Sequence, residues 1–149
     1  MLRGALGDVW YGKGMGLKRL DHINVCTCQL ERMKAFYSEV LGMPPGPRPN
    51  FSFGGAWMYC GELPSVHLVE RQKLEPTTGD LRLQHFAFAA EDLEGFLARL
   101  QRLDIPYRVG IVDDFKICQI NVNDPDGNHI HVDFPLAEAQ RLGVERTPR

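Results

Sequence analysis

LDHINV at residues 20–25 and LQHFAF at residues 83–88 are two copies of one short pattern, and this repeat decides the fold. Their histidines, His22 and His85, stand 63 positions apart (85 minus 22). In each half, a stretch whose apolar residues recur at helical spacing follows the pattern. The repeat predicts two similar units, each of which places one imidazole at the same point of its first strand.

The segments between these landmarks give both units the order β-α-β-β-β. In the first half we expect a strand over 19–27, a helix over 29–41 that ends at Gly42, and strands near 50–53, 56–60 and 65–71. In the second half we expect a strand over 83–89, a helix over 93–103, and strands over 107–111, 116–123 and 129–134. The prediction is an α+β fold in which two βαβββ modules form a curved mixed sheet around a cleft.

The chain is predicted to form one domain with two unequal ends. The domain spans 18–135 and consists of the units 18–72 and 81–135. Residues 1–17 are glycine-rich and aperiodic, which predicts a flexible leader, and 136–149 are interpreted as a C-terminal tail with a frayed end.

Composition excludes several classes of protein. The net charge of −2 lacks the basic excess of a nucleic-acid binder, and no apolar run is long enough to cross a bilayer. The N-terminus shows no secretory signal, so a cytoplasmic protein is expected. The four cysteines are interpreted as reduced thiols, because two lie one residue apart in one predicted strand rather than in a disulfide framework.

All five histidines fall in predicted strands, and their phase points to a cleft. In HIHVDF, His129, His131 and Asp133 alternate with three apolar residues, and His22 shares a face with Asn24. Imidazoles on one face suit a divalent transition metal, and a ligating imidazole needs a hydrogen-bond partner that fixes its tautomer. The candidates for such partners are Asn24, Gln119, Asn121 and Asp133, and His129 is interpreted either as another one or as exposed.

The repeated pattern, the helix LERMKAFYSEVLGM and the later NDPDGNHIH resemble the vicinal oxygen chelate superfamily over about 18–135. This superfamily includes glyoxalase I, extradiol ring-cleaving dioxygenases, methylmalonyl-CoA epimerase and fosfomycin- and bleomycin-resistance proteins. The resemblance implies metal ligands at His22, His85 and His131, the last at a position where most metal-binding members have glutamate. It also implies a fourth ligand at His67, with Glu70 as the alternative.

The resemblance further implies a divalent metal cofactor (Fe, Zn, Ni or Mn) that chelates two neighbouring oxygens of a small-molecule substrate. The expected substrate-binding residues are Phe53, Trp57, Tyr59 and Arg48, the last as an attractor for an anionic group. The expected function is that of a metalloenzyme, either dioxygenase-like or glyoxalase-like (a lyase or isomerase). The alternatives are a resistance-type protein that sequesters a small molecule without turnover, and a domain that serves only in an assembly. A homodimer is expected, because members of this size commonly pair and some build each metal site from both chains.

Overall fold

The computed structural model describes residues 19–75 and 82–148, so the predicted leader lies outside the described part. The first half contains β1 (Ile23–Thr27), α1 (Leu30–Ala35), the π-helical turn η1 (Phe36–Val40), β2 (Pro45–Gly46), β3 (Gly55–Cys60) and β4 (Leu63–Glu70). The second half contains β5 (Phe86–Ala89), α2 (Leu93–Arg102), β6 (Arg108–Val112), the 3-10 turn η2 (Asp113–Phe115), β7 (Ile117–Asn123), β8 (His129–Pro135) and α3 (Leu136–Leu142).

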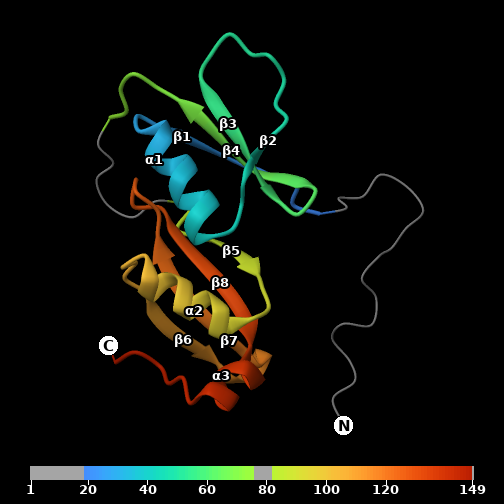
Figure 1. Ribbon diagram of the computed structural model, residues 1–149, viewed down its shortest axis with the longest axis vertical. Helices are drawn as coiled ribbons and strands as arrows, with labels where there is room; N and C mark the ends of the chain where they lie inside the picture. The colour runs from blue at the N-terminus through green and yellow to red at the C-terminus, as the bar shows by residue number, and fades with distance from the viewer. Residues whose placement is uncertain (1–18, 76–81, 149) are drawn as a thin grey trace, which may run out of the picture.

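The two halves form two sheets of the same topology, one above the other in Figure 1. The strand orders are β1-β4-β3-β2 and β5-β8-β7-β6. In each sheet the first strand pairs in parallel with the last strand of its half, and the remaining pairs are antiparallel. This arrangement confirms the predicted α+β fold with two βαβββ modules.

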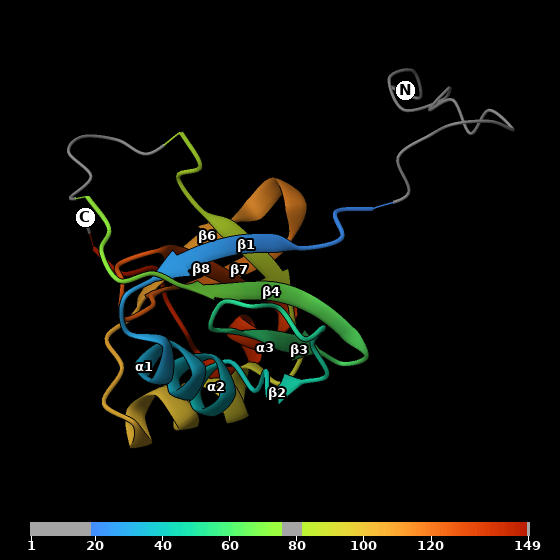
Figure 2. The ribbon, with the colours of Figure 1, turned by 90° about the horizontal axis from the view of Figure 1, so that it is seen from above.

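The helices α1 and α2 lie on one side of the molecule, and the strands lie behind them (Figures 1 and 2). Strand β8 explains this layering, because Ile130, Val132 and Phe134 are buried while the residues between them are half-buried. Apolar side chains of both halves join in one core cluster, which includes Met33, Phe36, Tyr37, Met58, Leu93, Phe96 and Leu100. The apolar face of each sheet therefore packs against the helices, and the histidine face points away from them.

Side-chain hydrogen bonds link the two halves on the helical side. The hydroxyl of Tyr37 donates to the buried carboxylate of Asp124 at 3.0 Å. The side-chain amide of Gln29 donates to the main-chain oxygen of Pro125 at 3.0 Å and to the carboxylate of Asp126. The turn between β7 and β8 is thus attached to the first helix of the other half.

Several predicted boundaries were wrong. The segment 50–53 is not a strand; the short edge strand β2 forms at Pro45–Gly46 instead, within the proline-rich segment, where an edge position tolerates the missing N–H. The helix predicted over 29–41 changes to π-helical pairing at Phe36, where the N–H of Leu41 donates to the Phe36 oxygen at 3.4 Å. His22 and His85 lie just before β1 and β5 rather than inside them.

The C-terminal segment is held against β6 and is not frayed over its described residues. The N–H of Thr147 donates to the Val109 oxygen at 3.1 Å, and its hydroxyl accepts the N–H of Val109 at 2.8 Å. The guanidinium of Arg146 donates to the Ile111 oxygen at 2.7 Å. The outer edge of the second sheet is therefore covered by the chain itself.

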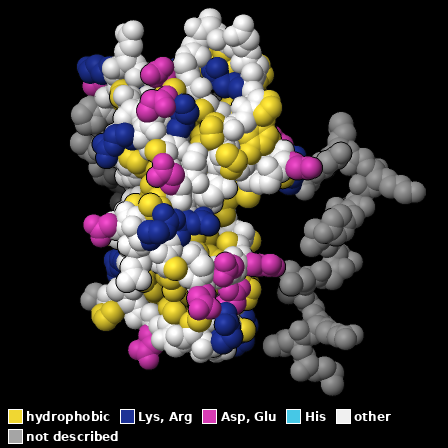
Figure 3. All heavy atoms as spheres, viewed as in Figure 1, with side chains coloured by type: hydrophobic (Ala, Val, Ile, Leu, Met, Phe, Trp, Pro, Cys, Tyr) yellow, Lys and Arg dark blue, Asp and Glu magenta, His cyan; other side chains and the backbone are white. Residues whose placement is uncertain are grey.

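The face that carries the helices shows charges of both signs on its upper and lower halves (Figure 3). Among the described residues, no helix has the length and apolarity that crossing a membrane would need.

Candidate metal centre

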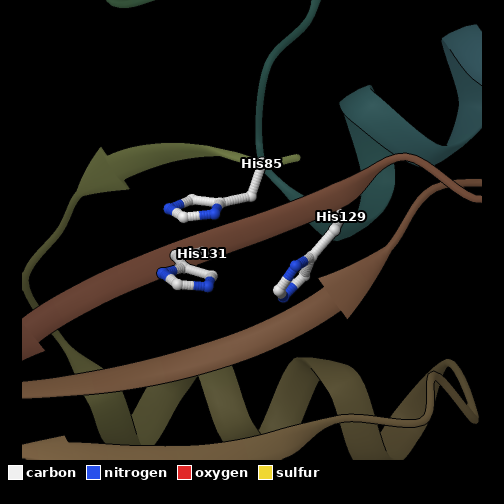
Figure 4. A group of neighbouring side chains, drawn as sticks. All are labelled: His85, His129 and His131. Atoms are coloured by element: carbon white, nitrogen blue, oxygen red, sulfur yellow. The ribbon is translucent and has the colours of Figure 1, made fainter. Parts of the chain in front are cut away.

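Three histidines of the second half gather beside the start of β5 (Figure 4). His85, His129 and His131 each offer a ring nitrogen, and these nitrogens lie within 4.8 Å of one another. The rings of His85 and His131 are stacked, with centroids 4.2 Å apart and an interplanar angle of 11°. The ring of His129 stands at 68° to that of His131. Parallel pairing of β5 with β8 brings these residues together across a sequence distance of more than 40 positions.

The first half carries an equivalent pair of imidazoles. The rings of His22 and His67 are stacked at 3.9 Å with an interplanar angle of 13°, and the indole of Trp57 covers the other face of His67 at 4.1 Å. His67 lies on β4, which pairs in parallel with β1 in the same way as β8 pairs with β5. The structure thus places His67 against His22 in the way that it places His131 against His85.

A hydrogen-bond acceptor precedes each histidine of the repeat. The carboxylate of Asp21 lies 2.9 Å from Nδ1 of His22, and Oε1 of Gln84 contacts Nδ1 of His85. Asp21 and Gln84 are themselves separated by the 63 positions of the repeat. In both halves, the side chain of the preceding residue therefore contacts Nδ1 of this histidine. This leaves Nε2 as the nitrogen that can bind another partner.

Burial favours the neutral form of two of these imidazoles, those of His131 and His67. Desolvation, together with the nearby His85 and His129, lowers the pKa of His131 to about 4. Desolvation and His22 lower the pKa of His67. A metal ion therefore need not displace protons from these two rings at neutral pH.

Two buried polar atoms near the histidines lack a hydrogen-bond partner. They are Nε2 of His67 and Oδ1 of Asp133, the residue that follows His131 on the same face of β8. A buried polar atom without a partner is costly, and a buried neutral imidazole nitrogen is a good metal ligand. The donor set of the histidine face therefore fits a divalent transition metal.

The sequence matches the family described as the Glyoxalase/Bleomycin resistance protein/Dioxygenase superfamily over residues 19–132. The chain belongs to this superfamily. It is 26% identical to YaeR of Escherichia coli (strain K12) over 122 residues, which cover 76% of this chain and 93% of YaeR. It is 24% identical to glutathione transferase FosA of Serratia marcescens over 134 residues, which cover 89% of this chain and 92% of FosA. Its structure is similar to that of a glyoxalase family protein from Bacillus anthracis, with a TM-score of 0.68 and 25% identity over 82% of this chain and 98% of the other.

The ligand positions expected from the superfamily fall into two separate groups within one chain. His22 lies with His67, and His85 lies with His131. In the described part of the chain, the group of His85, His129 and His131 is the only set of three or more such residues with donor atoms this close together. Glu70, the alternative to His67, is exposed at the end of β4. The predicted set of four histidines stays a prediction, and in one chain its members form two half-sites.

Of the residues predicted to bind substrate, Trp57 contacts the first half-site, whereas Tyr59 and Arg48 contact the loop before β3. Trp57 contacts His67 directly, and the hydroxyl of Tyr59 donates to the Pro47 oxygen at 2.7 Å. The guanidinium of Arg48 donates to the Phe53 oxygen at 2.8 Å and lies over the Phe53 ring at 5.1 Å. Trp57 is thus placed to form a wall, whereas Tyr59 and Arg48 hold the loop that precedes β3.

A cavity of about 720 Å³ opens beside the second half-site. His129, Asn121 and Gln119 line it from β8 and β7, and Arg108 lines it from β6. Gly110 contributes no side chain, and a Cβ there would lie 3.3 Å from the Gln119 side chain. This cavity gives a small molecule room next to His129, the one histidine among its lining residues.

Sequence reasoning missed Asp21 and Gln84 as partners of the histidines. The signal that could have found them is the repeat itself, because both residues immediately precede the matched histidines. Of the partners that were predicted, Asn121 contacts a histidine: its Oδ1 lies 2.9 Å from Nε2 of His129.

Proposed function

We propose that the protein is a homodimeric metalloenzyme that binds one small oxygenated substrate at each of two all-imidazole metal centres. The observation that carries this proposal is the pair of equivalent imidazole stacks, His22 with His67 and His85 with His131, one in each half. Each stack offers two ligands, which is half of a tetrahedral or larger set.

We place each centre between two subunits, with His22 and His67 from one chain and His85 and His131 of the partner subunit. The first strands β1 and β5 support this arrangement, because each is an unpaired edge of its sheet. Leu20 and Leu83, at matched positions just before these strands, are 80% and 65% exposed. Open edges flanked by exposed apolar side chains favour pairing with a second chain.

The chain's own residues would orient the ligands and shape the site. Asp21 and Gln84 hold the rings of His22 and His85 through Nδ1, and Trp57 packs on His67. A bound divalent ion would act as a Lewis acid toward two neighbouring substrate oxygens and stabilise negative charge that develops on them. The cavity beside His129 would receive the remainder of the substrate.

The reaction is either dioxygenase-like or glyoxalase-like, and a second function is supported by the ligand set. A tetrahedral set of imidazoles contains no carboxylate that could serve as a general base. This favours, as the alternative, a protein of the resistance type that binds a small molecule without turnover.

Metal analysis tests the proposed function. Untagged protein is expected to retain about one divalent ion per subunit, since a twofold dimer has two equivalent centres, and His85→Ala protein is expected to retain almost none. Oxygen consumption with a catechol identifies a dioxygenase, turnover of a hemithioacetal identifies an isomerase, and stoichiometric ligand binding without turnover identifies the alternative. Wild-type protein that takes up no transition metal from a stoichiometric solution would contradict the proposal.

His131→Glu is expected to change metal preference, because it restores an oxygen ligand where His131 now supplies nitrogen. Affinity for Mn²⁺ relative to Zn²⁺ should rise by about tenfold or more, since carboxylate suits manganese and imidazole suits zinc. Competition titrations with both ions measure this ratio. Gln101→Glu, which adds a carboxylate on the exposed surface of α2, is the control and should leave the ratio nearly unchanged.

A further inference from the structure

The two half-sites fix their histidines with different chemical groups. Asp21 is a carboxylate, which only accepts hydrogen bonds, so Nδ1 of His22 must carry the proton. Gln84 ends in an amide, which presents either an oxygen or an NH₂ group to Nδ1 of His85. Only one of these two orientations gives His85 the same tautomer as His22, so the orientation of the Gln84 amide needs a further constraint.

That constraint begins at main-chain carbonyls. The side-chain nitrogen of Asn121 lies 3.3 Å from the main-chain oxygens of Arg108 and Gln119, which can only accept. The amide of Asn121 therefore turns its oxygen toward His129, 2.9 Å from Nε2. Nε2 of His129 must carry the proton, and Nδ1 of this neutral ring is left as an acceptor.

The same logic continues from His129 to His85. Nδ1 of His129 lies 3.1 Å from Nε2 of Gln84, so the NH₂ group of Gln84 faces His129. The oxygen of Gln84 then faces His85 and accepts its Nδ1–H. The lone pair of His85 is thereby assigned to Nε2.

We propose that His129 is a positioning residue rather than a metal ligand: together with Gln84 and Asn121 it forms a relay that sets the tautomer of His85 from fixed main-chain carbonyls. Both ring nitrogens of His129 already have amide partners, which separates it from His85 and His131 although all three lie close together (Figure 4). The relay fixes the tautomer of His85 in the second half-site, as Asp21 fixes the tautomer of His22 in the first. Its role in metal binding rests on the proposed function, but the tautomer of His85 does not.

The test is to measure histidine tautomers in the metal-free protein by long-range ¹H–¹⁵N correlation spectra at pH 7.5. In the wild type, His22 and His85 are both expected to carry the proton on Nδ1. In His129→Phe protein the Gln84 amide loses its orienting partner, so His85 should become a mixture of tautomers while His22 stays unchanged as an internal control. Zn²⁺ affinity should fall by about 10- to 100-fold, the usual effect of losing a partner that orients a ligand.

A rescue variant separates positioning from ligation. Gln84→Glu introduces an acceptor that cannot flip, so the double variant Gln84→Glu/His129→Phe should regain the Nδ1–H tautomer of His85 and most of the lost Zn²⁺ affinity. Gln84→Met, a change at an exposed residue, should mimic His129→Phe if the latter folds poorly. An unchanged His85 tautomer in His129→Phe and Gln84→Met, or a rescue variant that remains as weak as His85→Ala, would overturn the relay. A wild type that binds no Zn²⁺ but shows these tautomers would contradict only the proposed function.

Discussion

Co-expression of His22→Ala and His131→Ala chains is expected to restore metal binding that neither variant has alone. Each variant by itself loses one ligand from every centre, and its affinity should fall by more than about 100-fold, beyond the range for changes around a ligand. In a mixed dimer, both substitutions fall in one centre and the other centre keeps all four histidines. Random pairing therefore restores about a quarter of the centres, because a twofold dimer has two equivalent sites. Metal analysis of purified doubly tagged dimers, in which one centre of the two is intact, tests this directly.

The control is co-expression of His22→Ala with His67→Ala. These residues belong to the same half-site, since their rings are stacked in one chain. Every centre of such a mixed dimer lacks one ligand, so no metal should return. If neither mixture regains metal while the wild type binds it, the ligands come from a single chain and the shared centre is wrong.

Asp124→Ala is expected to destabilise the protein by about 3 kcal/mol, because it leaves the buried Tyr37 hydroxyl and several partly buried donors without an acceptor. The carboxylate accepts the Tyr37 hydroxyl, the N–H of Asp126 at 3.0 Å, and both the main-chain and side-chain nitrogens of Asn128. Burial raises the pKa of Asp124, and the donors from Asn128, Tyr37 and Asp126 act in the opposite direction. Equilibrium unfolding in urea measures the loss.

Two further variants locate the origin of this effect. Tyr37→Phe removes one of the donors and should cost about 1 kcal/mol. Asp126→Ala, in the same turn but exposed, removes only the contact with Gln29 and should change the free energy of unfolding by less than about 1 kcal/mol. Equal losses in Asp124→Ala and Asp126→Ala would show that the turn, and not the buried carboxylate, links the halves.

The fold could be predicted where a short-range sequence pattern, such as strand alternation or a glycine after a helix, is enough to determine the structure. The alternation of HIHVDF set the buried face of β8, and Gly42 adopts the left-handed conformation (φ +69) that its place after the helix required. Such a pattern failed at β2, because that strand forms through pairing of Pro45 with Met58, a contact distant in sequence. In the turn before β8, Gly127 takes positive φ, and the Asn128 side chain donates to Asp124.

Part of the candidate site could be predicted, because the repeat and the alternation within each strand can be read from individual positions of the sequence. The alternation of HIHVDF selected His131, whereas the resemblance to the superfamily selected His67. They could not select Gln84 as a partner or show that His129 uses both ring nitrogens, since these contacts depend on side-chain positions across three strands. A single sequence also cannot show whether two half-sites meet within a chain or between chains.

The segment Arg146–Thr147 on β6 also limits how copies of this protein can associate. Each sheet has two rims. In the second sheet the C-terminal segment covers the rim at β6, and in the first sheet the rim at β2 is a two-residue strand that begins at a proline. Among the described residues, only the rims at β1 and β5 stay open, and in the proposed dimer one twofold partner would satisfy both at once. Association through these rims in the proposed dimer would be self-limiting and would prevent the open-ended polymerisation to which bare strand rims are prone.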